Sequence, residues 1–547
     1  MEGTDAMITT IENDTLSLLF GSPWPLEDHA HFVRSKALPE AEIKYDESAD
    51  TYEVRAPARF APLMGMEMPV PCRSPLPLPD FLFDYQAWIT RMAVEAKRFA
   101  VWADCGLGKT PIQLEWARQV HHLTGGRVLI MAPRAVIPQT IEETEKFYPQ
   151  LPLTCPDIRL SRITTREDLA VWCKEGPEPF AIVNPEKMID GVLPEMRWLS
   201  GIALDESSLL KTGGGVIKWN LIKSCRGIEY KLSLTATPAP NDTMEYASQA
   251  AFLEKLRHEG EILWTYFAKD KRGVWKVKPH ARDAFYRFMS SWSIYLRKPG
   301  AYGFHDPFSD VPEPEIVEHR IEPTAEQLAA RDQVRGVREE GDLLPRERIG
   351  VAQRGKLSQI AKGFRYEGGE SSRKVTPIKS LKPTVVGALV RKAAAEGRQV
   401  LVWCVFDEEA KIVGRHLKGV KGVAQLHGDT PEGKRERILE DFRHGKIRVL
   451  VGKAGMLGYG LNFPFVETMV FSGYDDSFER FYQAVRRAYR YGATKRLTVH
   501  LPYIPGLEDH IWENILRKKS QWEEDTAACE RAYAAAFSCI QNNTTKS

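Results

Sequence analysis

The sequence has no cysteine pairs and no long apolar segment. Its eight cysteines stand singly among 547 residues, without a Cys-x-x-Cys motif. This spacing argues against a zinc site and a disulfide framework, and it is typical of a reducing compartment. No apolar run approaches the ~20 residues of a membrane-spanning helix. The amino-terminal stretch also lacks the basic start and apolar core of a secretory signal. We therefore expect a cytoplasmic protein.

An excess of one charge is also missing from the chain as a whole. Lys+Arg number 75 and Asp+Glu 73, so the formal net charge is only +2. The charge is unevenly distributed, because residues 1–60 carry −7 and the remainder carries +9. A basic body is compatible with a polyanionic partner. Solvated charged faces give the same balance, so composition alone leaves the partner open.

Short apolar runs alternate with helical periodicity in two regions. In the first region the runs are FAVWAD, RVLIMAP, AIVNP, GIALDE and YKLSLTAT, and in the second they are QVLVWC, VAQLHG, IRVLVGK, TMVFSG and RLTVHLP. This alternation is typical of a parallel sheet covered by helices. The sequence therefore predicts an α/β fold with two parallel-sheet lobes in tandem.

The breaks in this pattern predict the domain boundaries. A proline-rich stretch, MPVPCRSPLPLPD, is expected to be an extended linker after a possible strand pair in EIKYDESADTYEVRA. The predicted parts are an N-terminal accessory region (1–78), a first lobe (79–310) with a helical and aromatic-rich insert (242–300), a linker (311–381), a second lobe (382–505) and a C-terminal helix (506–547).

The stretch VWADCGLGKT, which begins at Val101, places a glycine-rich turn between an apolar strand and a helical pattern. It fits [AG]-x-x-x-x-G-K-[ST], a form of the phosphate-binding loop. Backbone N–H groups of such a turn, with the positive end of the following helix, hold phosphate oxygens. A turn with a chance Gly-Lys-Thr is the structural alternative. The residues expected to hold ATP are Asp104, Cys105, Gly106, Leu107, Gly108, Lys109 and Thr110. Lys109 would reach the β- and γ-phosphates, and the Thr110 hydroxyl would bind Mg²⁺.

A second acidic element follows in GIALDESSLLK, where an apolar strand ends in Asp205 and Glu206. An aspartate at a strand end can bind Mg²⁺, and the adjacent glutamate can orient and deprotonate the attacking water. A surface acidic pair is the alternative for this motif alone. The upstream loop favours the catalytic interpretation. In LSLTATP, the hydroxyls of Ser233, Thr235 and Thr237 are candidates to couple phosphate to backbone movement.

The second lobe contains SFERFYQAVRRAYRYG, with Ser477 as the expected helix N-cap. Gln483, Arg487 and Arg490 lie at i, i+4 and i+7, so we expect them on one helix face. Two guanidinium groups on that face could act as arginine fingers on a γ-phosphate held by the other lobe. A basic solvated helix would explain the charges but not their spacing.

Together these motifs resemble superfamily-two helicases. The motifs, in order, are Gln86 in FDYQ, ADCGLGKT, LDESS, LTATP, LHGDT, KAGMLGYGLNF and QAVRRAYRYG. Within the superfamily they are similar to the Snf-like branch, the chromatin-remodeller ATPases and their compact bacterial and phage relatives. The resemblance covers residues 80–505. DESS stands where DEAH or DEGH is commoner.

The resemblance implies two RecA-like lobes that bind ATP and Mg²⁺, in a bacterial or phage-infected cell. It implies that Gln86 reads adenine, that Gln483 contacts the nucleotide, and that Gly458, Gly460 and Asn462 couple the nucleotide state to nucleic acid. The implied activity is DNA-stimulated ATP hydrolysis by a DNA translocase or helicase, with duplex DNA favoured as partner. An RNA helicase, a small-molecule kinase and a non-catalytic nucleic-acid-binding scaffold are the alternatives.

The insert TYFAKDKRGVWKVKPHARDAFYRF interleaves basic and aromatic side chains. Basic residues neutralise backbone phosphates, and aromatic rings stack on bases. An amphipathic insert packed on the core, with a solvated basic side, is the alternative. The candidate DNA contacts are Lys271, Arg272, Trp275, Lys276 and Lys278.

Overall fold

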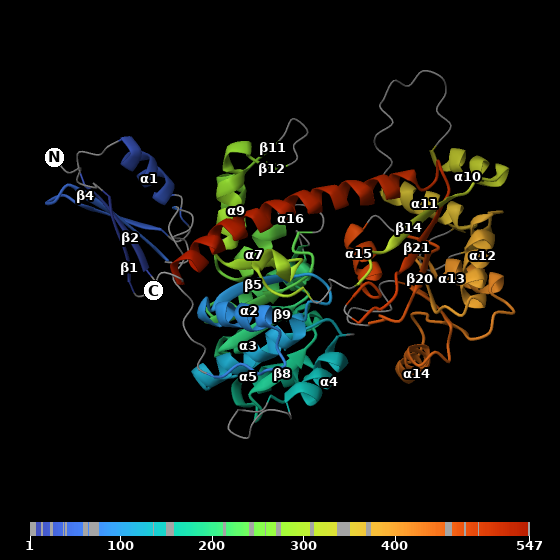
Figure 1. The fold of residues 1–547 in the computed structure, drawn as a ribbon, viewed down its shortest axis with the longest axis horizontal. Coiled ribbons are helices and arrows are strands. Elements are labelled where there is room, and N and C mark those ends of the chain that lie inside the picture. The colour runs from blue at the N-terminus through green and yellow to red at the C-terminus, as the bar shows by residue number, and fades with distance from the viewer. Residues whose placement is uncertain are drawn as a thin grey trace, which may run out of the picture. The chain divides into compact units, whose positions relative to one another are not determined.

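The computed structural model describes residues 7–12, 15–21, 26–36, 38, 41–57, 64, 76–134, 136–148, 158–211, 215–239, 245–256, 259–269, 275–306, 311–335, 351–367, 374–453, 462–474, 477–490 and 492–544. The chain divides into two compact units (Figure 1). Unit 1 comprises Met1–Asp306 and Trp522–Ser547, and unit 2 comprises Pro307–Gln521.

Unit 1 is built around a seven-stranded sheet in which every pairing is parallel. In spatial order the strands are β13 (Ser293–Leu296), β5 (Arg98–Ala103), β10 (Tyr230–Leu234), β9 (Gly201–Asp205), β6 (Val128–Met131), β8 (Phe180–Val183) and β7 (Ser161–Arg162). The central strands are apolar and wholly buried, as expected for a sheet covered on both faces. The predicted α/β class is confirmed.

The helices of unit 1 connect these strands or follow them. They are α2 (Asp84–Glu95), α3 (Lys109–Thr124), α4 (Ile137–Phe147), α5 (Arg166–Glu175), α6 (Val216–Ser224), α7 (Tyr246–Phe252), α8 (Gly260–Tyr266) and α9 (Arg282–Ser290). A hairpin of β11 (Phe267–Lys269) and β12 (Trp275–Val277) separates α8 from α9 (Figure 1).

The segment predicted as an insert, 242–300, is only partly one. Its last strand, β13, is fully buried and pairs in parallel with β5 at the edge of the central sheet. The four residues of β13 are too few for sequence periodicity to show that they form a strand of the central sheet. Because β13 belongs to that sheet, the inserted segment ends with α9.

An antiparallel sheet forms the beginning of the chain. Its order is β1 (Met7–Glu12), β2 (Thr15–Gly21), β4 (Thr51–Pro57) and β3 (Glu42–Asp46), and α1 (Leu26–Lys36) lies between β2 and β3 in sequence. The β3–β4 pair is the strand pair predicted from EIKYDESADTYEVRA. The alternating burial of β2 puts Leu16, Leu18 and Phe20 on its apolar face.

Unit 2 has a second all-parallel sheet, of six strands. In spatial order they are β14 (Glu315–Arg320), β21 (Thr498–Tyr503), β20 (Thr468–Phe471), β17 (Val400–Cys404), β19 (Val449–Lys453) and β18 (Val423–Gln425). Its helices are α10 (Ala325–Arg335), α11 (Val351–Ala361), α12 (Lys382–Ala395), α13 (Asp407–His416), α14 (Glu432–Arg443) and α15 (Phe478–Arg486).

Residues 311–381 were predicted as a linker, and the described part of this segment is folded. Strand β14 pairs along its whole length with β21. Helix α11 contributes Leu357 and Ile360 to a small core with Ile504 and Leu507. A short hairpin, β15 (Phe364–Glu367) and β16 (Lys374–Pro377), follows α11. The charged segment 311–381 therefore contains an edge strand, β14, and two packed helices, α10 and α11, that its composition did not predict.

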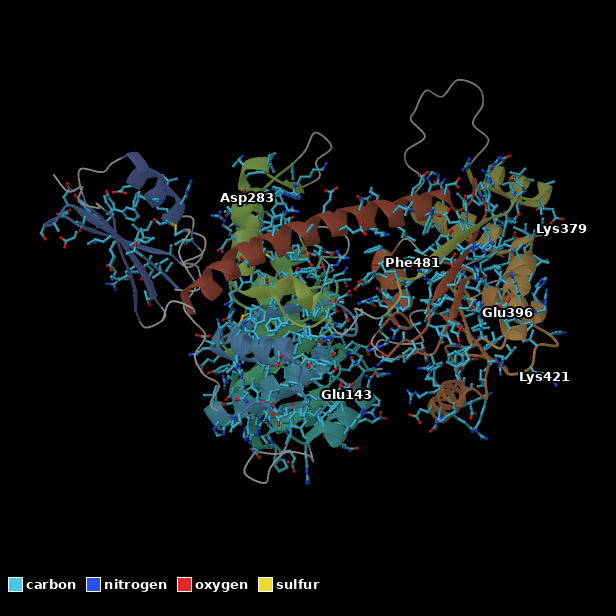
Figure 2. The ribbon with its side chains drawn as sticks, viewed as in Figure 1. Glu143, Asp283, Lys379, Glu396, Lys421 and Phe481 are labelled. Atoms are coloured by element: carbon cyan, nitrogen blue, oxygen red, sulfur yellow. The ribbon has the colours of Figure 1, made fainter. Side chains whose placement is uncertain are left out.

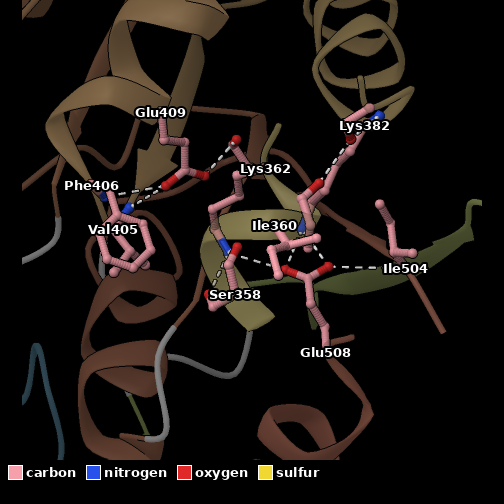
Figure 3. A network of polar contacts seen from close by, with 12 residues as sticks. Ser358, Ile360, Lys362, Lys382, Val405, Phe406, Glu409, Ile504 and Glu508 are labelled. Atoms are coloured by element: carbon pink, nitrogen blue, oxygen red, sulfur yellow. Dashed lines mark hydrogen bonds and ion pairs between the residues drawn. The ribbon is translucent and has the colours of Figure 1, made fainter. Parts of the chain in front are cut away.

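A buried ionic network joins separate elements of unit 2 (Figure 3). Glu508, which precedes α16 (Asp509–Thr544), accepts hydrogen bonds from Lys362 Nζ at 3.0 Å and from Lys382 Nζ at 2.7 Å. All three side chains are at most 1% exposed. Burial lowers the pKa of Lys382 to about 8, against the charge of Glu508. The carboxylate thus ties α11, α12 and the start of α16 together.

Helix α16 spans Asp509–Thr544 and thus falls within the predicted C-terminal helix. Its residue Thr526 donates a hydrogen bond of 2.9 Å to the hydroxyl of Tyr295 in β13. Among the described residues, no helix has both the length and the apolar character needed to cross a membrane.

Candidate active site

The topology of unit 1 brings three predicted motifs to one edge of its sheet. Strand β10 lies between β5 and β9, and Leu234 is in register with both Val101 and Asp205. Because the strands are parallel, their carboxyl ends share an edge. The glycine loop after β5, Thr235 after β10 and Asp205 at the end of β9 therefore meet there.

The glycine loop has the backbone shape of an anion-binding turn. Gly106 and Gly108 have φ values of 89° and 71°, which glycine adopts readily. Helix α3 begins directly afterwards at Lys109, so its N-terminus faces the loop. Lys109 Nζ donates a 2.9 Å hydrogen bond to the carbonyl of Ala103 at the end of β5. Cys105 N–H donates to the Asp104 carboxylate at 2.7 Å, which closes the turn.

Gln86 lies against this loop and is 4% exposed. Its Nε2 donates to the Leu107 carbonyl at 3.2 Å, and its Oε1 accepts from the Phe83 N–H at 3.0 Å. A β-carbon at Gly108 would collide with the Gln86 amide. Gln86 thus links the start of α2 to the loop. Its predicted contact with adenine stays a prediction.

Asp205 is the buried carboxylate of the site, at 8% exposed. Burial and then the charge of Glu206 raise its pKa to about 7, while Lys109 opposes this shift. Glu143 of α4 (Figure 2) raises it further. Buried oxygen donors with excess negative charge are the donor set that Mg²⁺ prefers. Asp205, with the Thr110 hydroxyl at the start of α3, therefore fits the predicted Mg²⁺ site.

Glu206 is held in an unusual conformation. Its φ is 55°, in the left-handed region that non-glycine residues seldom adopt. Such strain persists only where the surroundings enforce it and is common at active sites. Its Oε1 accepts hydrogen bonds from Thr235 Oγ1 at 2.9 Å and Ser208 Oγ at 3.0 Å. The DESS and LTATP motifs thus meet at one carboxylate oxygen.

Gln249 of α7 connects the same motifs through hydrogen bonds, and the sequence analysis did not identify it. Its Oε1 accepts from Trp102 Nε1 at 2.8 Å, Ser233 Oγ at 2.9 Å and Ser207 Oγ at 3.2 Å. Its Nε2 donates to the Pro238 carbonyl at 2.9 Å. The side chain is 1% exposed. A lone amide in the small, apolar run YASQAAF was the available signal.

In unit 2 the expected helix face does not extend to Arg490. Ser477 caps α15 as predicted, but the helix ends at Arg486 and Arg487 is its C-cap. The Arg487 carbonyl accepts a hydrogen bond from Phe463 N–H at 2.8 Å, which turns the chain out of the helix. Gln483 lies within α15 and is 9% exposed. The Arg490 guanidinium lies beyond the helix and hydrogen-bonds the Asn462 side chain.

Three predicted site residues lie outside the described residues. They are Gly460 of unit 2 and two candidate DNA contacts, Lys271 and Arg272. Lys276 is exposed on β12. Lys278 instead donates to the carbonyls of Trp264 and Thr265 at 2.9 and 3.1 Å, so it caps the end of α8. Trp275 is partly buried against the core, and the Lys269 ammonium lies 5.2 Å from its ring centre.

Known proteins resemble part of the chain in sequence. The ATP-dependent RNA helicase dbp-3 of Neurospora crassa is 35% identical over 82 residues, 15% of this chain and 13% of that protein. The corresponding dbp3 of Schizosaccharomyces pombe is 28% identical over 145 residues, 26% of this chain and 25% of that protein. The chain thus spans a quarter or less of these curated relatives.

Solved structures resemble most of the chain, at low identity. The Sulfolobus solfataricus SWI2/SNF2 ATPase core in complex with dsDNA is 19% identical, with a TM-score of 0.36, over 85% of this chain and 96% of that one. The Pyrococcus furiosus Hef helicase domain is 16% identical, with a TM-score of 0.44, over 78% and 97%. Residues 382–492 match the family described as helicase conserved C-terminal domain. The matched residues all lie within unit 2.

Proposed function

We propose that the chain is a nucleic-acid-dependent ATPase that moves along DNA. The observation that carries the proposal is the strand-end constellation of unit 1. There Asp205, the strained Glu206 and the loop of Lys109 share one sheet edge, and Thr235 hydrogen-bonds the glutamate. The helicase C-terminal domain of unit 2 supplies the second part that such ATPases need.

The residues divide the chemistry between them. The loop N–H groups and Lys109 bind the β- and γ-phosphates of ATP, and Thr110 and Asp205 hold Mg²⁺. The bound ion would neutralise charge on the phosphate oxygens. Glu206 orients a water and accepts its proton as that water attacks the γ-phosphorus, while the bond from this phosphorus to the β,γ-bridging oxygen breaks and ADP leaves. Thr235 and Ser208 fix the carboxylate orientation through the bonds described above.

Arg487 and Arg490 are proposed to act on the same γ-phosphate from unit 2. A guanidinium aimed at the transferring group stabilises charge that grows in the transition state. The bond between Arg490 and Asn462 links this arginine to the KAGMLGYGLNF motif. That motif is the one expected to respond to nucleic acid. Binding of nucleic acid could thereby control when the arginine reaches the phosphate.

DNA is the favoured polymer because the motif set resembles the Snf-like branch. An RNA helicase is the second candidate, since the curated relatives that resemble part of the chain are named as RNA helicases. A non-catalytic scaffold is disfavoured, because Lys109, Asp205 and Glu206 are all present. A small-molecule kinase would have no use for a helicase C-terminal domain.

Two substitutions test the ATPase assignment. Lys109→Ala should abolish turnover and weaken nucleotide binding, because it removes the cation for the phosphates. Glu206→Gln should bind ATP normally but hydrolyse it slowly, because only proton acceptance is lost. Steady-state hydrolysis and the affinity for a fluorescent ATP analogue separate the two. Glu229→Gln, an exposed carboxylate before β10, is the control and should behave as wild type. Wild-type turnover in a folded Glu206→Gln protein would refute the assignment.

A further inference from the structure

Trp264 is an unusually exposed aromatic side chain. At 68% exposed, it exceeds the other exposed large hydrophobic residues that the structure describes. It lies on α8, whose Ile262 and Tyr266 are 0% and 7% exposed and pack into the core. Those two residues are four apart and define the inner face of the helix. Trp264 lies midway between them, so it belongs to the outer face.

The hairpin after α8 also has an inner and an outer face. Phe267 pairs with Val277, and Lys269 pairs with Trp275, so these four side chains share one face. Phe267 is 2% exposed, and Trp275 and Val277 pack against the same core. The ring of Trp275 is further covered by the Lys269 ammonium. Trp275, the aromatic residue first expected to contact DNA, is thus a packing residue.

The outer face of the hairpin carries the opposite pair, Ala268 and Lys276, and both are exposed. Lys278 directly follows β12, and its Nζ donates to the Trp264 and Thr265 carbonyls. These bonds fasten the end of α8 to the hairpin. They bring the backbone at Trp264 to the part of the chain that follows Lys276.

The charge of this segment is positive. The basic side chains between residues 259 and 287 of the described chain are Lys269, Lys276, Lys278, Arg282 and Arg287, and the acidic ones are Glu259, Glu261 and Asp283. A basic surface with an exposed aromatic ring has the chemistry of a site for single-stranded nucleic acid. Lysines neutralise phosphates there, and a ring stacks on an unpaired base.

We propose that α8 and the β11–β12 hairpin form a contact for unpaired nucleotides, in which Trp264 stacks on a base and Lys276 contacts phosphate. The inference rests on the proposed function and refines it, because it moves the aromatic contact from Trp275 to Trp264. The same surface would engage a duplex only through its phosphates, since paired bases present no free face. Its contribution therefore depends on unpaired bases, at a fork, a tail or a single strand.

The test measures binding of the full-length chain to two fluorescent probes, a dT20 oligonucleotide and a blunt 20-base-pair duplex. Trp264→Ala should weaken dT20 binding by about 5- to 160-fold, the range for one lost stacked base. The same variant should bind the blunt duplex within about twofold of wild type, since no stacking is lost there. Trp264→Phe keeps a ring and should recover most of the dT20 affinity.

Trp198→Ala is the matched control. Trp198 is 58% exposed. It precedes β9, a strand of the seven-stranded sheet of unit 1, and so lies at the amino-terminal edge of that sheet. It should leave dT20 binding unchanged. Unchanged dT20 binding in Trp264→Ala, equal losses on both probes, or an equal loss in Trp198→Ala would each overturn the proposal. ATP hydrolysis by the wild-type chain is measured separately. A chain that binds dT20 through Trp264 but hydrolyses no ATP would reject the proposed function and keep this contact.

Discussion

Two hydroxyls and a strained backbone fix the proposed catalytic base. Sequence motifs identified Lys109, Asp205 and Glu206 because their chemistry depends on short local patterns at strand ends. The same patterns could not reveal Gln249, which lies 42 residues from Ser207 and 147 from Trp102 along the chain. Its role arises only when β5, β9 and β10 are placed side by side. Residues that act locally were thus predictable, and a residue that acts by bridging strands was not.

Replacing Gln249 should destabilise unit 1. Gln249→Leu leaves the donors of Trp102, Ser207 and Ser233 buried without their shared acceptor. Each unsatisfied buried group costs roughly 1–3 kcal/mol, so we expect a loss of at least about 2 kcal/mol in the free energy of unfolding. Urea denaturation followed by circular dichroism measures this loss.

Gln113 of α3 provides the control for that experiment. It is also fully buried, but its amide atoms have no hydrogen-bond partner within the described chain. Gln113→Leu removes no hydrogen bond and relieves a buried polar group, so its unfolding free energy should stay within about 1 kcal/mol of wild type or rise. Equal effects of the two substitutions would mean that the Gln249 contacts contribute nothing specific.

The arginines of unit 2 should act in catalysis rather than in binding. Arg487→Ala and Arg490→Ala should each reduce turnover, by as much as on the order of 10³-fold, while ATP affinity stays nearly constant. Single-turnover hydrolysis with nucleic acid present separates the two quantities. Arg480→Ala, an exposed residue of the same helix α15, is the control. Normal turnover in both test variants would remove the arginines from the mechanism.

At the scale of elements, strands with an apolar run in the sequence were predicted, and strands without such a run were not. The apolar runs from FAVWAD to RLTVHLP all became strands of the two parallel sheets. β13 and β14 were missed, since one lies in an aromatic-rich segment and the other is an edge strand with exposed charges. α15 ends at Arg486, and the Arg487 carbonyl accepts a hydrogen bond from Phe463 N–H. Periodicity carries no information about such a tertiary hydrogen bond.

The pairing of β14 with β21 creates a pH-sensitive contact. His319 Nε2 lies 3.0 Å from His500 Nδ1, so an N–H group of one ring donates a hydrogen bond to the bare nitrogen of the other. Burial lowers the pKa of both, that of His500 to about 4 with the help of the His319 charge. If both imidazole rings were protonated, the N–H group at His319 Nε2 would face the N–H group at His500 Nδ1, and the hydrogen bond would be lost. Below pH ~6.5 the unfolded chain binds protons that the folded chain excludes, so stability falls from there towards pH 4.

This prediction is checked with the thermal midpoint of unfolding at pH 7.5 and at pH 5. The wild-type midpoint should fall over this interval by more than that of His500→Asn, which has no imidazole to protonate. His444→Asn, an exposed histidine at the end of α14, should retain the full wild-type dependence. Identical pH dependence in wild type and His500→Asn would show that the pair does not contribute.

At the scale of the whole molecule, we propose that groups from both α/β units are needed for ATP hydrolysis. Unit 1 contains the phosphate loop and the acidic pair, and unit 2 contains the two arginines and the stretch that matches the helicase conserved C-terminal domain. Neither unit alone has every group that the proposed hydrolysis requires. The rate should therefore respond to a polymer that engages both units, which a self-contained kinase site would not do.

The most direct test is the steady-state ATPase rate of the full-length chain without nucleic acid, and with single-stranded DNA, duplex DNA or RNA. The account predicts a low basal rate that DNA increases, with duplex DNA at least as effective as single strands and RNA less effective. Glu206→Gln should stay slow under every condition. A rate that is the same with and without each polymer would contradict the central claim, and stimulation by RNA alone would establish the RNA helicase instead.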